Sequence, residues 1–258
     1  MQMFKTIASI INLKALIVTV LAVASTYLCL RYEILANFPL TLIATAIVFP
    51  VVFSIGGAYK RREVALHHYG SIKANGRAIY FAARDWLENP SDETLTEART
   101  RLGGFLDACR TLFTGEDAHL RANEDRVYNE FSNLSKFIKT QLRANGLPAG
   151  ECSRCNQYLS KMFISFESIK HIYQYRTPSS LRAFSDFFIC ILPIVYGPYF
   201  AHLAQDYSVH ALAYVTPVLF SLILVSLDNI QDHLENPFDG IGEDDVAINV
   251  EQFVGRLN

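Results

Sequence analysis

The chain has 258 residues, of which 51% are hydrophobic and 19% are charged, and its formal net charge is -2. Soluble proteins usually carry about 25% charged residues, so this composition is too apolar for an ordinary soluble domain. It is also too polar for a protein that lies wholly in a membrane. Most Lys and Arg fall within residues 60–182, and the tail after residue 227 is acidic, so nothing indicates nucleic-acid binding.

Four apolar segments stand out along the chain. A bilayer core of about 30 Å takes about 20 apolar residues in a helix, with a lower limit near 17. The second segment reaches that length only if residues 38–59 are counted. No cleavage site of small residues follows the first segment, so we do not expect a removed signal peptide. We predict four membrane-spanning helices, at Leu13–Leu30, Leu40–Ile55, Phe184–Ala204 and Val209–Leu227.

The basic residues beside these segments predict an orientation in the membrane. Lys60, Arg61 and Arg62 directly follow the second segment, while Arg176 and Arg182 precede the third. By the positive-inside rule, the middle region and both termini are expected to be cytoplasmic. The compact length and the lack of an obvious transit peptide favour a multi-pass protein of a bacterial inner membrane.

The region between the second and third segments has the pattern of helix throughout. Residues 63–87 continue the second segment as a long amphipathic helix, without a clear stop signal. Ser91 can cap the next helix, which runs to about Phe113. A third helix is expected to end at Asn145-Gly146, and a fourth to cover about residues 151–175.

We therefore predict an all-α membrane protein with four transmembrane helices and a cytoplasmic helical domain. Residues 1–59 are expected to hold the N-terminal region with the first and second spans, and residues 60–182 the cytoplasmic domain. Residues 183–228 are expected to hold the third and fourth spans. Residues 229–258 form a cytoplasmic acidic segment, in which Asp244 and Asp245 can cap a last short helix. The apolar stripe of that helix needs a partner, either this domain or a neighbouring subunit.

No residue spacing typical of a common enzyme is present, so no enzyme activity is expected. Cys152 and Cys155 form a lone CxxC without the further ligands of a zinc site, and ordinary reduced thiols are expected. His67 and His68 point in different directions on a helix, so they are poor joint metal ligands. Asp186 near the start of the third span is either interfacial or functional.

The second apolar segment places Thr45, Phe49 and Phe53 on one helical face, at i, i+4 and i+8. In a ring of identical subunits, such a face could line a pore with a hydrophobic constriction that gates by dewetting. Phenyl edges are weakly positive and would tolerate anions better than cations. Plain helix packing in lipid is the alternative, and periodicity alone does not exclude it.

An acidic cluster follows the turn Asn236-Pro237-Phe238. Oxygen ligands on a loop suit calcium, although the spacing is not that of an EF-hand. A solvated capping loop is the other interpretation of these residues, which are Asp239, Glu243, Asp244 and Asp245.

Because of three sequence blocks, the chain resembles the bestrophin family, and it is most similar to the bacterial members of that family. The first, PLTLIATAIVFPVVFSIGGAYKRREVALHHYG (residues 39–70), is similar to the family's pore helix. The second, RTPSSLRAFSDFFICILP (residues 176–193), resembles its Pro-containing loop and third span. The third, SLDNIQDHLENPFDGIGEDD (residues 226–245), resembles its acidic helix and Pro-Phe turn.

The resemblance implies a homopentameric ion channel in the lipid bilayer that passes small inorganic anions such as chloride, with an apolar neck at Thr45, Phe49 and Phe53. It places a cytoplasmic aperture near Thr177, Ser179 and Ser180, which are polar here rather than bulky. It also implies a possible calcium clasp at Asn236, Asp244 and Asp245, and no other cofactor is expected. Two alternatives remain open: a cation-conducting homologue, and a non-conducting membrane-anchored scaffold or sensor.

Overall fold

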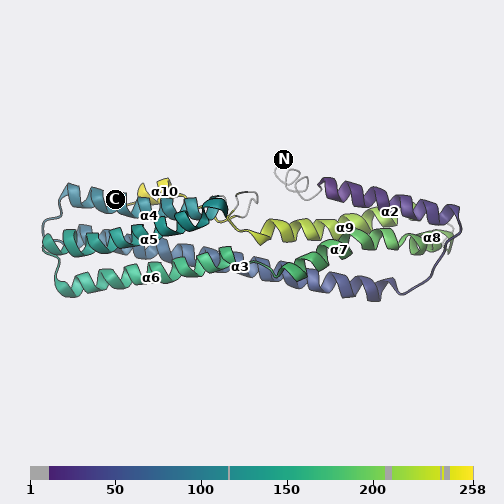
Figure 1. The fold of residues 1–258 in the computed structure, drawn as a ribbon, viewed down its shortest axis with the longest axis horizontal. Coiled ribbons are helices and arrows are strands. Elements are labelled where there is room, and N and C mark those ends of the chain that lie inside the picture. The colour runs from purple at the N-terminus through teal and green to yellow at the C-terminus, as the bar shows by residue number, and fades with distance from the viewer. Residues whose placement is uncertain (1–11, 116, 207–210, 239, 241–244, 258) are drawn as a thin grey trace. The chain divides into compact units, whose positions relative to one another are not determined.

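The structure, a computed structural model, describes residues 12–115, 117–206, 211–238, 240 and 245–257 (Figure 1). These residues form helices, turns and irregular segments, and the described part of the chain holds no strand. The chain divides into two compact units. We call Met1–Lys60 with Thr177–Glu235 the membrane unit, and Arg61–Arg176 with Asn236–Asn258 the polar unit.

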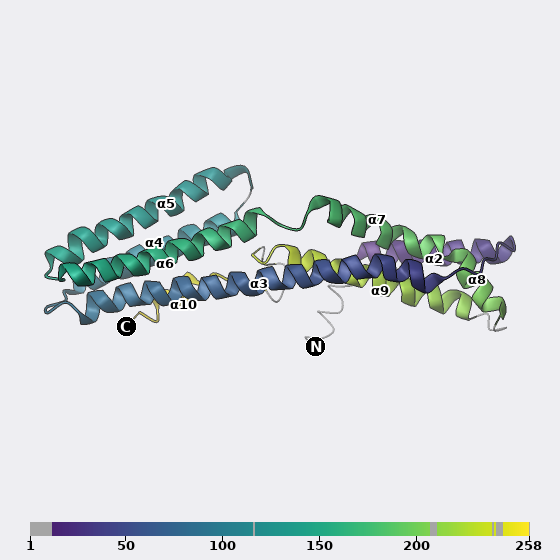
Figure 2. The same ribbon diagram turned by 90° about the horizontal axis from the view of Figure 1, so that it is seen from below.

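The membrane unit is built from apolar helices that lie side by side (Figures 1 and 2). Four helical stretches of the described chain are long and apolar enough to cross a membrane, as the sequence predicts. Helix α2 packs against α7, α8 and α9. The bounds are Leu13–Arg31 for α2, Ser179–Val195 for α7, Gly197–Asp206 for α8 and Leu212–Glu235 for α9; the start of α3 (Leu40–Asp85) completes the unit.

The third predicted span is two helices rather than one. Helix α7 ends at Val195 and α8 begins at Gly197. A β-carbon at Gly197 would clash with Ser25 Oγ, so only glycine allows this close approach to α2. Ser25 Oγ also donates a hydrogen bond of 2.7 Å to the carbonyl of Ile194. The carbonyl of Ile194, next to the break between α7 and α8, is therefore paired with a neighbouring helix.

Helix α3 continues from the second apolar segment into the polar unit without interruption, as predicted (Figure 2). It has 46 residues and includes Pro50. Proline has no N–H, so the carbonyl of Ala46 lacks its usual helical donor at this point. One continuous helix thus contributes both to the membrane unit and to the polar unit.

The polar unit is a group of antiparallel helices with an aromatic core. Ser91 accepts a hydrogen bond of 3.1 Å from Thr94 N, which confirms the predicted cap. Gly146, at φ +96°, follows the last helical turn before the next helix, and only glycine adopts this conformation readily. The helices are α4 Asp92–Thr114, the 3-10 turn Asp117–His119, α5 Leu120–Phe137, the π-turn Ile138–Leu142 and α6 Ala149–Gln174, together with the rest of α3.

The C-terminal segment differs from the sequence prediction. Residues 245–249 are not helical, and α10 covers only Val250–Val254. Its cap is Asn249, whose side chain accepts a hydrogen bond of 2.7 Å from Gln252 N. The predicted cap by Asp245 is therefore wrong, and Asp244 lies outside the described residues. Val246 and Ile248 are buried while Ala247 is exposed between them, because the extended segment packs one side against the polar unit.

The partner of the C-terminal apolar stripe is the polar unit of the same chain. Phe253 and Leu257 belong to its buried core, and Val254 packs against Gly103 of α4. Upstream of this stripe, Phe238 stacks on Phe113 with 4.9 Å between the ring centroids. The sequence predicts that the cytoplasmic domain ends at residue 182 and that the fourth span ends by residue 228. Both are statements about the position of the membrane, and they stay predictions.

Candidate functional site

The face of α3 that carries the predicted neck is exposed in the single chain. Phe49 and Phe53 are 61% and 65% exposed, and Thr45 is exposed as well. Since successive helical residues are about 100° apart, these positions lie on the side of the helix opposite to its buried stripe. That stripe, which packs into the membrane unit, is Ile47, Val51, Ser54 and Ala58.

The two phenylalanine rings of the predicted neck contact each other. Their centroids are 4.6 Å apart at an interplanar angle of 69°, an edge-to-face pair. Thr45 Oγ donates a hydrogen bond of 2.6 Å to the carbonyl of Thr41 on the same helix. The exposed face therefore presents one threonine oxygen and two coupled rings. This face carries no charge from Leu42 to Gly56. Lys60 and Glu63 follow further along the helix.

The predicted aperture residues are not alike in the structure. Thr177 is half-buried, and its N–H and its hydroxyl donate hydrogen bonds of 2.8 and 2.7 Å to the carboxylate of Glu235. Ser179 and Ser180 are exposed in the first turn of α7. The structure brings Thr177 to the end of α9 rather than leaving it free, and the aperture assignment stays a prediction.

The predicted calcium clasp is only partly described. Asn236 Oδ1 accepts a hydrogen bond of 3.3 Å from Phe238 N, which closes the Pro-Phe turn. Asp245 is half-buried, and Asp244 lies outside the described residues, as do Asp239 and Glu243. No group of three or more His, Cys, Asp and Glu in the described ranges is placed to hold a metal ion. Calcium binding stays an untested expectation.

Sequence reasoning missed the partners of Asp186. Lys14, in the first turn of α2, donates hydrogen bonds to Asp228 and, at 3.1 Å, to Asp186. The side chain of Asp228 is only 2% exposed. The feature of the sequence that could have revealed these partners is a lysine at the start of the first apolar segment together with an aspartate at the end of the last. Their pairing depends on antiparallel packing of α2 and α9, which no local pattern specifies.

Further polar contacts join the same helix ends. Arg182 of α7 lies 2.6 Å from Asp232 of α9, and Asn12 donates a hydrogen bond of 2.8 Å to Asn229. We call this set the polar clamp; it consists of Asn12, Lys14, Thr177, Arg182, Asp186, Asp228, Asn229, Asp232 and Glu235.

The CxxC cysteines and the His67-His68 pair, all within the described residues, lack the arrangement of a reactive centre. Cys152 and Cys155 are both buried and free. Burial raises the pKa of the Cys155 thiol to about 12, so the reactive thiolate is scarce at neutral pH. The rings of His67 and His68 contact only edge to face, 5.6 Å apart. These geometries support the sequence interpretation of ordinary thiols and packing histidines.

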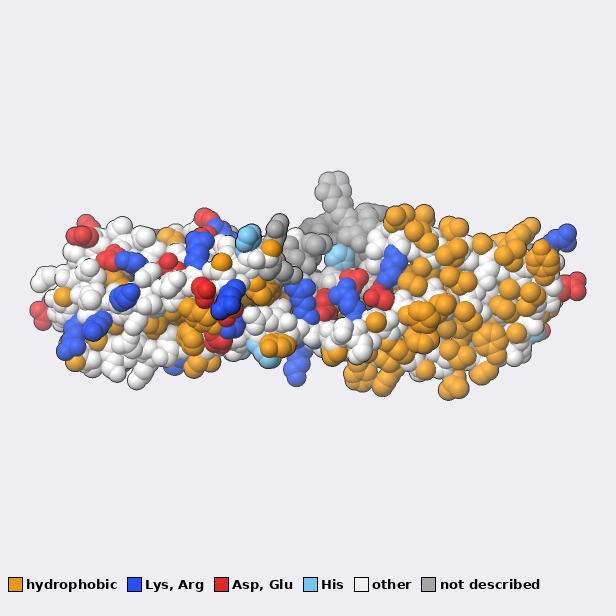
Figure 3. All heavy atoms as spheres, in the orientation of Figure 1, with side chains coloured by type: hydrophobic (Ala, Val, Ile, Leu, Met, Phe, Trp, Pro, Cys, Tyr) orange, Lys and Arg blue, Asp and Glu red, His pale blue; other side chains and the backbone are white. Residues whose placement is uncertain are grey.

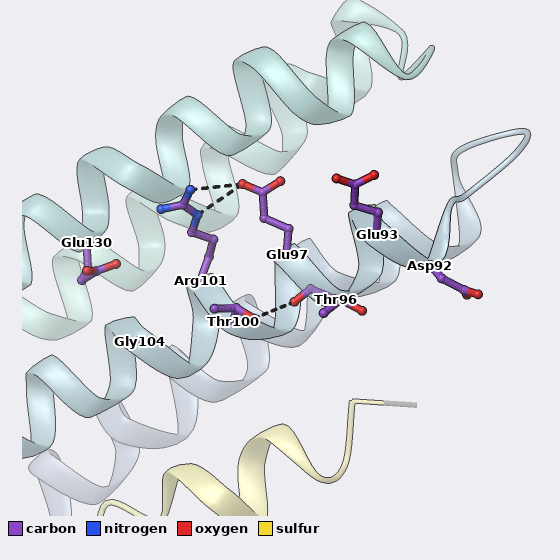
Figure 4. A pocket seen from close by; sticks show the side chains of 8 residues that line it. All are labelled: Asp92, Glu93, Thr96, Glu97, Thr100, Arg101, Gly104 and Glu130. Carbon is purple, nitrogen blue, oxygen red and sulfur yellow. Dashed lines mark hydrogen bonds and ion pairs between the residues drawn. The ribbon is translucent and has the colours of Figure 1, made fainter.

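An acidic groove lies at the start of α4 in the polar unit (Figure 4). Glu93 projects to the same side of α4 as Glu97, whereas Asp92 points away from it, and Glu97 pairs with Arg101 at 3.1 Å. Glu130 of α5 lies across the groove near Gly104. The groove has a volume of about 810 Å³. Acidic side chains in the first helical turn interact favourably with the helix dipole, which accounts for Asp92 and Glu93 without a ligand.

Solved structures share this fold. A bacterial bestrophin homologue from Klebsiella pneumoniae has a TM-score of 0.75 at 16% identity, covering 95% of this chain and 96% of its own. A crystal structure of a bacterial bestrophin homologue from the same organism with one mutation has a TM-score of 0.76 at 18% identity, covering 95% and 97%. A structure described as a membrane protein has a TM-score of 0.76 at 17% identity, covering 95% and 98%.

No protein-family model and no curated protein matches the sequence. At identities of 16–18% the structural likeness establishes the fold. The chain therefore has the fold of bacterial bestrophin homologues and is an all-α membrane protein. The resemblance read from the three sequence blocks is confirmed at that level.

Proposed function

We propose that this protein is an ion channel in which the exposed face of α3, from several copies of the chain, lines an axial pathway. The observation that carries the proposal is the exposure of Phe49 and Phe53 on the side of α3 that the chain leaves uncovered. A single helix cannot enclose a pathway, so the proposal requires an oligomer. The bestrophin-like fold supports a pentamer, as the resemblance of the sequence implies.

The chemistry of this face suits passive conduction rather than covalent catalysis. Rings of phenylalanine form an apolar constriction, through which a chain of water molecules is easily broken. Such a neck holds ions back when it is dry and lets them pass when it is wide enough to stay wet. Phe49 and Phe53 support each other edge to face, 4.6 Å apart, which favours a defined neck geometry.

We propose a preference for small anions. Helix α3 begins at Leu40, and the unpaired N–H groups of a helix start carry about half a positive charge, which attracts anions. Several copies would place several such helix starts around the mouth of the pathway. Ring edges that remain uncovered in the phenylalanine pairs would add weakly positive surface further along.

One observation favours cations as the second candidate. The hydroxyl proton of Thr45 is donated to the Thr41 carbonyl, so the remaining lone pairs of Thr45 Oγ act as acceptors. The carbonyl of Ala46, which Pro50 deprives of its donor, is a second acceptor on the neighbouring part of the helix surface. Acceptor oxygens replace the hydration of cations, not of anions.

The test is a flux and bilayer recording of the purified protein in liposomes with chloride and sodium gradients. The reversal potential is expected near the chloride equilibrium potential. Phe49→Ala and Phe53→Ala are each expected to raise conductance several-fold, because a wider neck remains hydrated. Thr45→Val removes one acceptor oxygen and should move the reversal potential further toward chloride if that oxygen admits cations.

The matched control is Phe187→Ala, which removes a phenylalanine that is 57% exposed on α7. It is expected to leave conductance and reversal potential unchanged. The neck assignment is wrong if Phe49→Ala and Phe53→Ala behave like this control. A reversal potential at the sodium equilibrium potential would support the cation-conducting alternative, and a complete lack of flux would favour the scaffold or sensor. A cell-membrane location with both termini cytoplasmic is part of the proposal, and protease accessibility in right-side-out vesicles tests it.

A further inference from the structure

The C-terminal segment lies along one side of α3 within the polar unit. The N–H of Asn249 donates a hydrogen bond of 3.2 Å to the Tyr69 hydroxyl. Two turns further along α3, a β-carbon at Gly76 would be 3.4 Å from the ring of Phe253. The two contacts follow the same order in both segments, so this stretch of α3 and residues 249–253 run side by side.

Basic side chains gather where these two segments meet. The Lys73 ammonium lies 4.2 Å from the centroid of the Tyr69 ring, and the Arg77 guanidinium lies 5.5 Å from that of Phe253. Arg256 is exposed and follows Phe253 by three residues. Arg77 and Arg256 are close enough to repel the ammonium of Lys73 electrostatically.

The side chains of Lys73 and Arg77 contact neutral aromatic rings. Nε of Arg77 is buried and has no hydrogen-bond partner among the described residues. In the described part of the chain, no ion pair joins Lys73, Arg77 or Arg256 to a carboxylate. The acidic residue of α10, Glu251, is already paired with Arg110 of α4 at 3.1 Å.

Another arginine adds to the positive potential. Arg99 of α4 donates hydrogen bonds of 2.9 Å to the Leu257 carbonyl and 2.7 Å to the Tyr80 hydroxyl, both uncharged acceptors. Crowding like charges without a counter-charge is unfavourable, and cation–ring contacts at exposed sites compensate for this repulsion only in part. Donor-rich, acceptor-free clusters of this kind match an anion that can accept several hydrogen bonds.

We propose that Lys73, Arg77 and Arg256 form a binding site for a multivalent oxyanion of the phosphate type. Phosphate carries about 1.5 to 2 negative charges at pH 7 and offers several strong acceptor oxygens. Planar guanidinium groups bind such oxygens two at a time, whereas chloride offers neither the charge nor that geometry. The ligand is free phosphate or the phosphate group of a larger metabolite, because both present the same chemistry.

This site goes beyond ion conduction and does not depend on it. Binding is measured on the full-length protein in detergent, where no flux occurs, so failure of the channel proposal and failure of this one are separate results. Because the C-terminal segment supplies Arg256, bound phosphate should also hold that segment more firmly against α3.

The test is thermal unfolding of the purified protein, followed by circular dichroism, during titration with phosphate, sulfate and AMP at constant ionic strength set with chloride. Phosphate and sulfate are expected to raise the transition temperature in a saturable manner, since a ligand that binds only the folded state stabilises it. A shift with AMP would show that a phosphate on a larger molecule is accepted. Phosphate binding without an AMP shift would identify free phosphate as the ligand.

Arg256→Gln is the central variant, because Arg256 is exposed and the change removes charge with little effect on packing. It is expected to weaken the apparent phosphate affinity by about tenfold, the loss of one charge-assisted contact. Arg256→Lys should restore part of the affinity, and Lys139→Gln, an exposed cation elsewhere in the polar unit, should leave it unchanged. The proposal fails if Arg256→Gln keeps the wild-type titration, or if chloride stabilises the protein as well as phosphate does.

Discussion

The two units of this chain place their apolar side chains in opposite ways. In the membrane unit, large apolar residues such as Leu16, Leu42 and Ile223 are more than half exposed. Figure 3 shows hydrophobic side chains over much of the visible face of this unit. In the polar unit the visible face carries scattered charges, while aromatic residues such as Phe105 and Phe166 are fully buried. Helix α3 belongs to both units and shows the pattern of each in turn: Phe49 and Phe53 are exposed in the membrane unit, and Ile72 and Ile79 are buried in the polar unit.

This contrast has a physical cause. Lipid tails are as apolar as leucine, so burial of apolar surface does not drive one membrane helix against another. Polar contacts and close packing must fix the helix register there, and the polar clamp does so at one end of α2, α7 and α9. In water, burial of the aromatic core is itself the driving force. The two units should therefore respond differently to the same kinds of substitution.

The largest expected effect is that of removing a core aromatic residue from the polar unit. Phe105 is fully buried and contacts Phe131 at a centroid distance of 4.5 Å. Phe105→Ala is expected to reduce the free energy of unfolding by about 3–5 kcal/mol through lost burial and a cavity. Unfolding in denaturant, followed by circular dichroism of the detergent-solubilised protein, measures this loss.

The exposed Phe187 of the membrane unit provides the comparison, since the same substitution there should cost about 0.5 kcal/mol or less. Equal losses at the two positions would contradict the view that apolar burial drives only the polar unit.

The next effect is expected in the polar clamp. Lys14→Met leaves the buried carboxylate of Asp228 without its cation, which should cost about 3 kcal/mol, the lower end for breaking a buried pair. The double variant Lys14→Met/Asp228→Leu removes both charges and should recover most of that loss. Unfolding in mixed micelles measures both.

The control within the clamp is Arg182→Met, because Arg182 and Asp232 are each 41% exposed. An exposed pair contributes about 0–1 kcal/mol, so this variant should be nearly neutral. If it is as harmful as Lys14→Met, burial does not decide the strength of the clamp.

The smallest effect is expected in the polar network of the polar unit. Lys170 donates hydrogen bonds of 2.9 Å to Glu124 and 2.6 Å to the Tyr128 hydroxyl, and it lies 2.8 Å from Glu167. Its hydrogen bond lowers the pKa of Glu124 from the ordinary 4.5. Lys170→Met should cost about 1–2 kcal/mol, because the remaining carboxylates and hydroxyl lose a shared donor.

The pH dependence of that loss follows from the direction of the Glu124 shift. A carboxyl group whose pKa is lowered on folding contributes stability above its unfolded pKa, and this contribution is lost as pH falls through the folded value. The difference between wild type and Lys170→Met should therefore be full at pH 6 and smaller below about pH 4, near the unfolded pKa of glutamate. A difference that does not change with pH would exclude the ionised Glu124 as its source.

Much of the fold could be predicted because its signals are local. Apolar runs of sufficient length gave α2, α3 and α9, and Ser91 and Gly146 marked helix ends by their own backbone chemistry. The stripe of Thr45, Phe49 and Phe53 followed from helical periodicity. The structure adds that this stripe faces away from the rest of the membrane unit, which periodicity alone could not decide.

Other features depend on partners far away in the sequence. Asp244 and Asp245 have suitable chemistry for a cap, but the cap of α10 is Asn249, because residues 246–248 are drawn into an extended contact with the polar unit. The break at Gly197 depends on the close approach of Ser25, 172 residues earlier.

The sequence by itself determined which segments are helical, which of them are apolar enough for a membrane, and which residues share a helical face, since each property depends on neighbours within a few turns. Only the tertiary structure decided which face of α3 stays uncovered, which acids Lys14 meets, and how Lys73, Arg77 and Arg256 come together. Those arrangements arise when helices distant in the sequence pack side by side, and packing depends on the shape and charge of both surfaces at once.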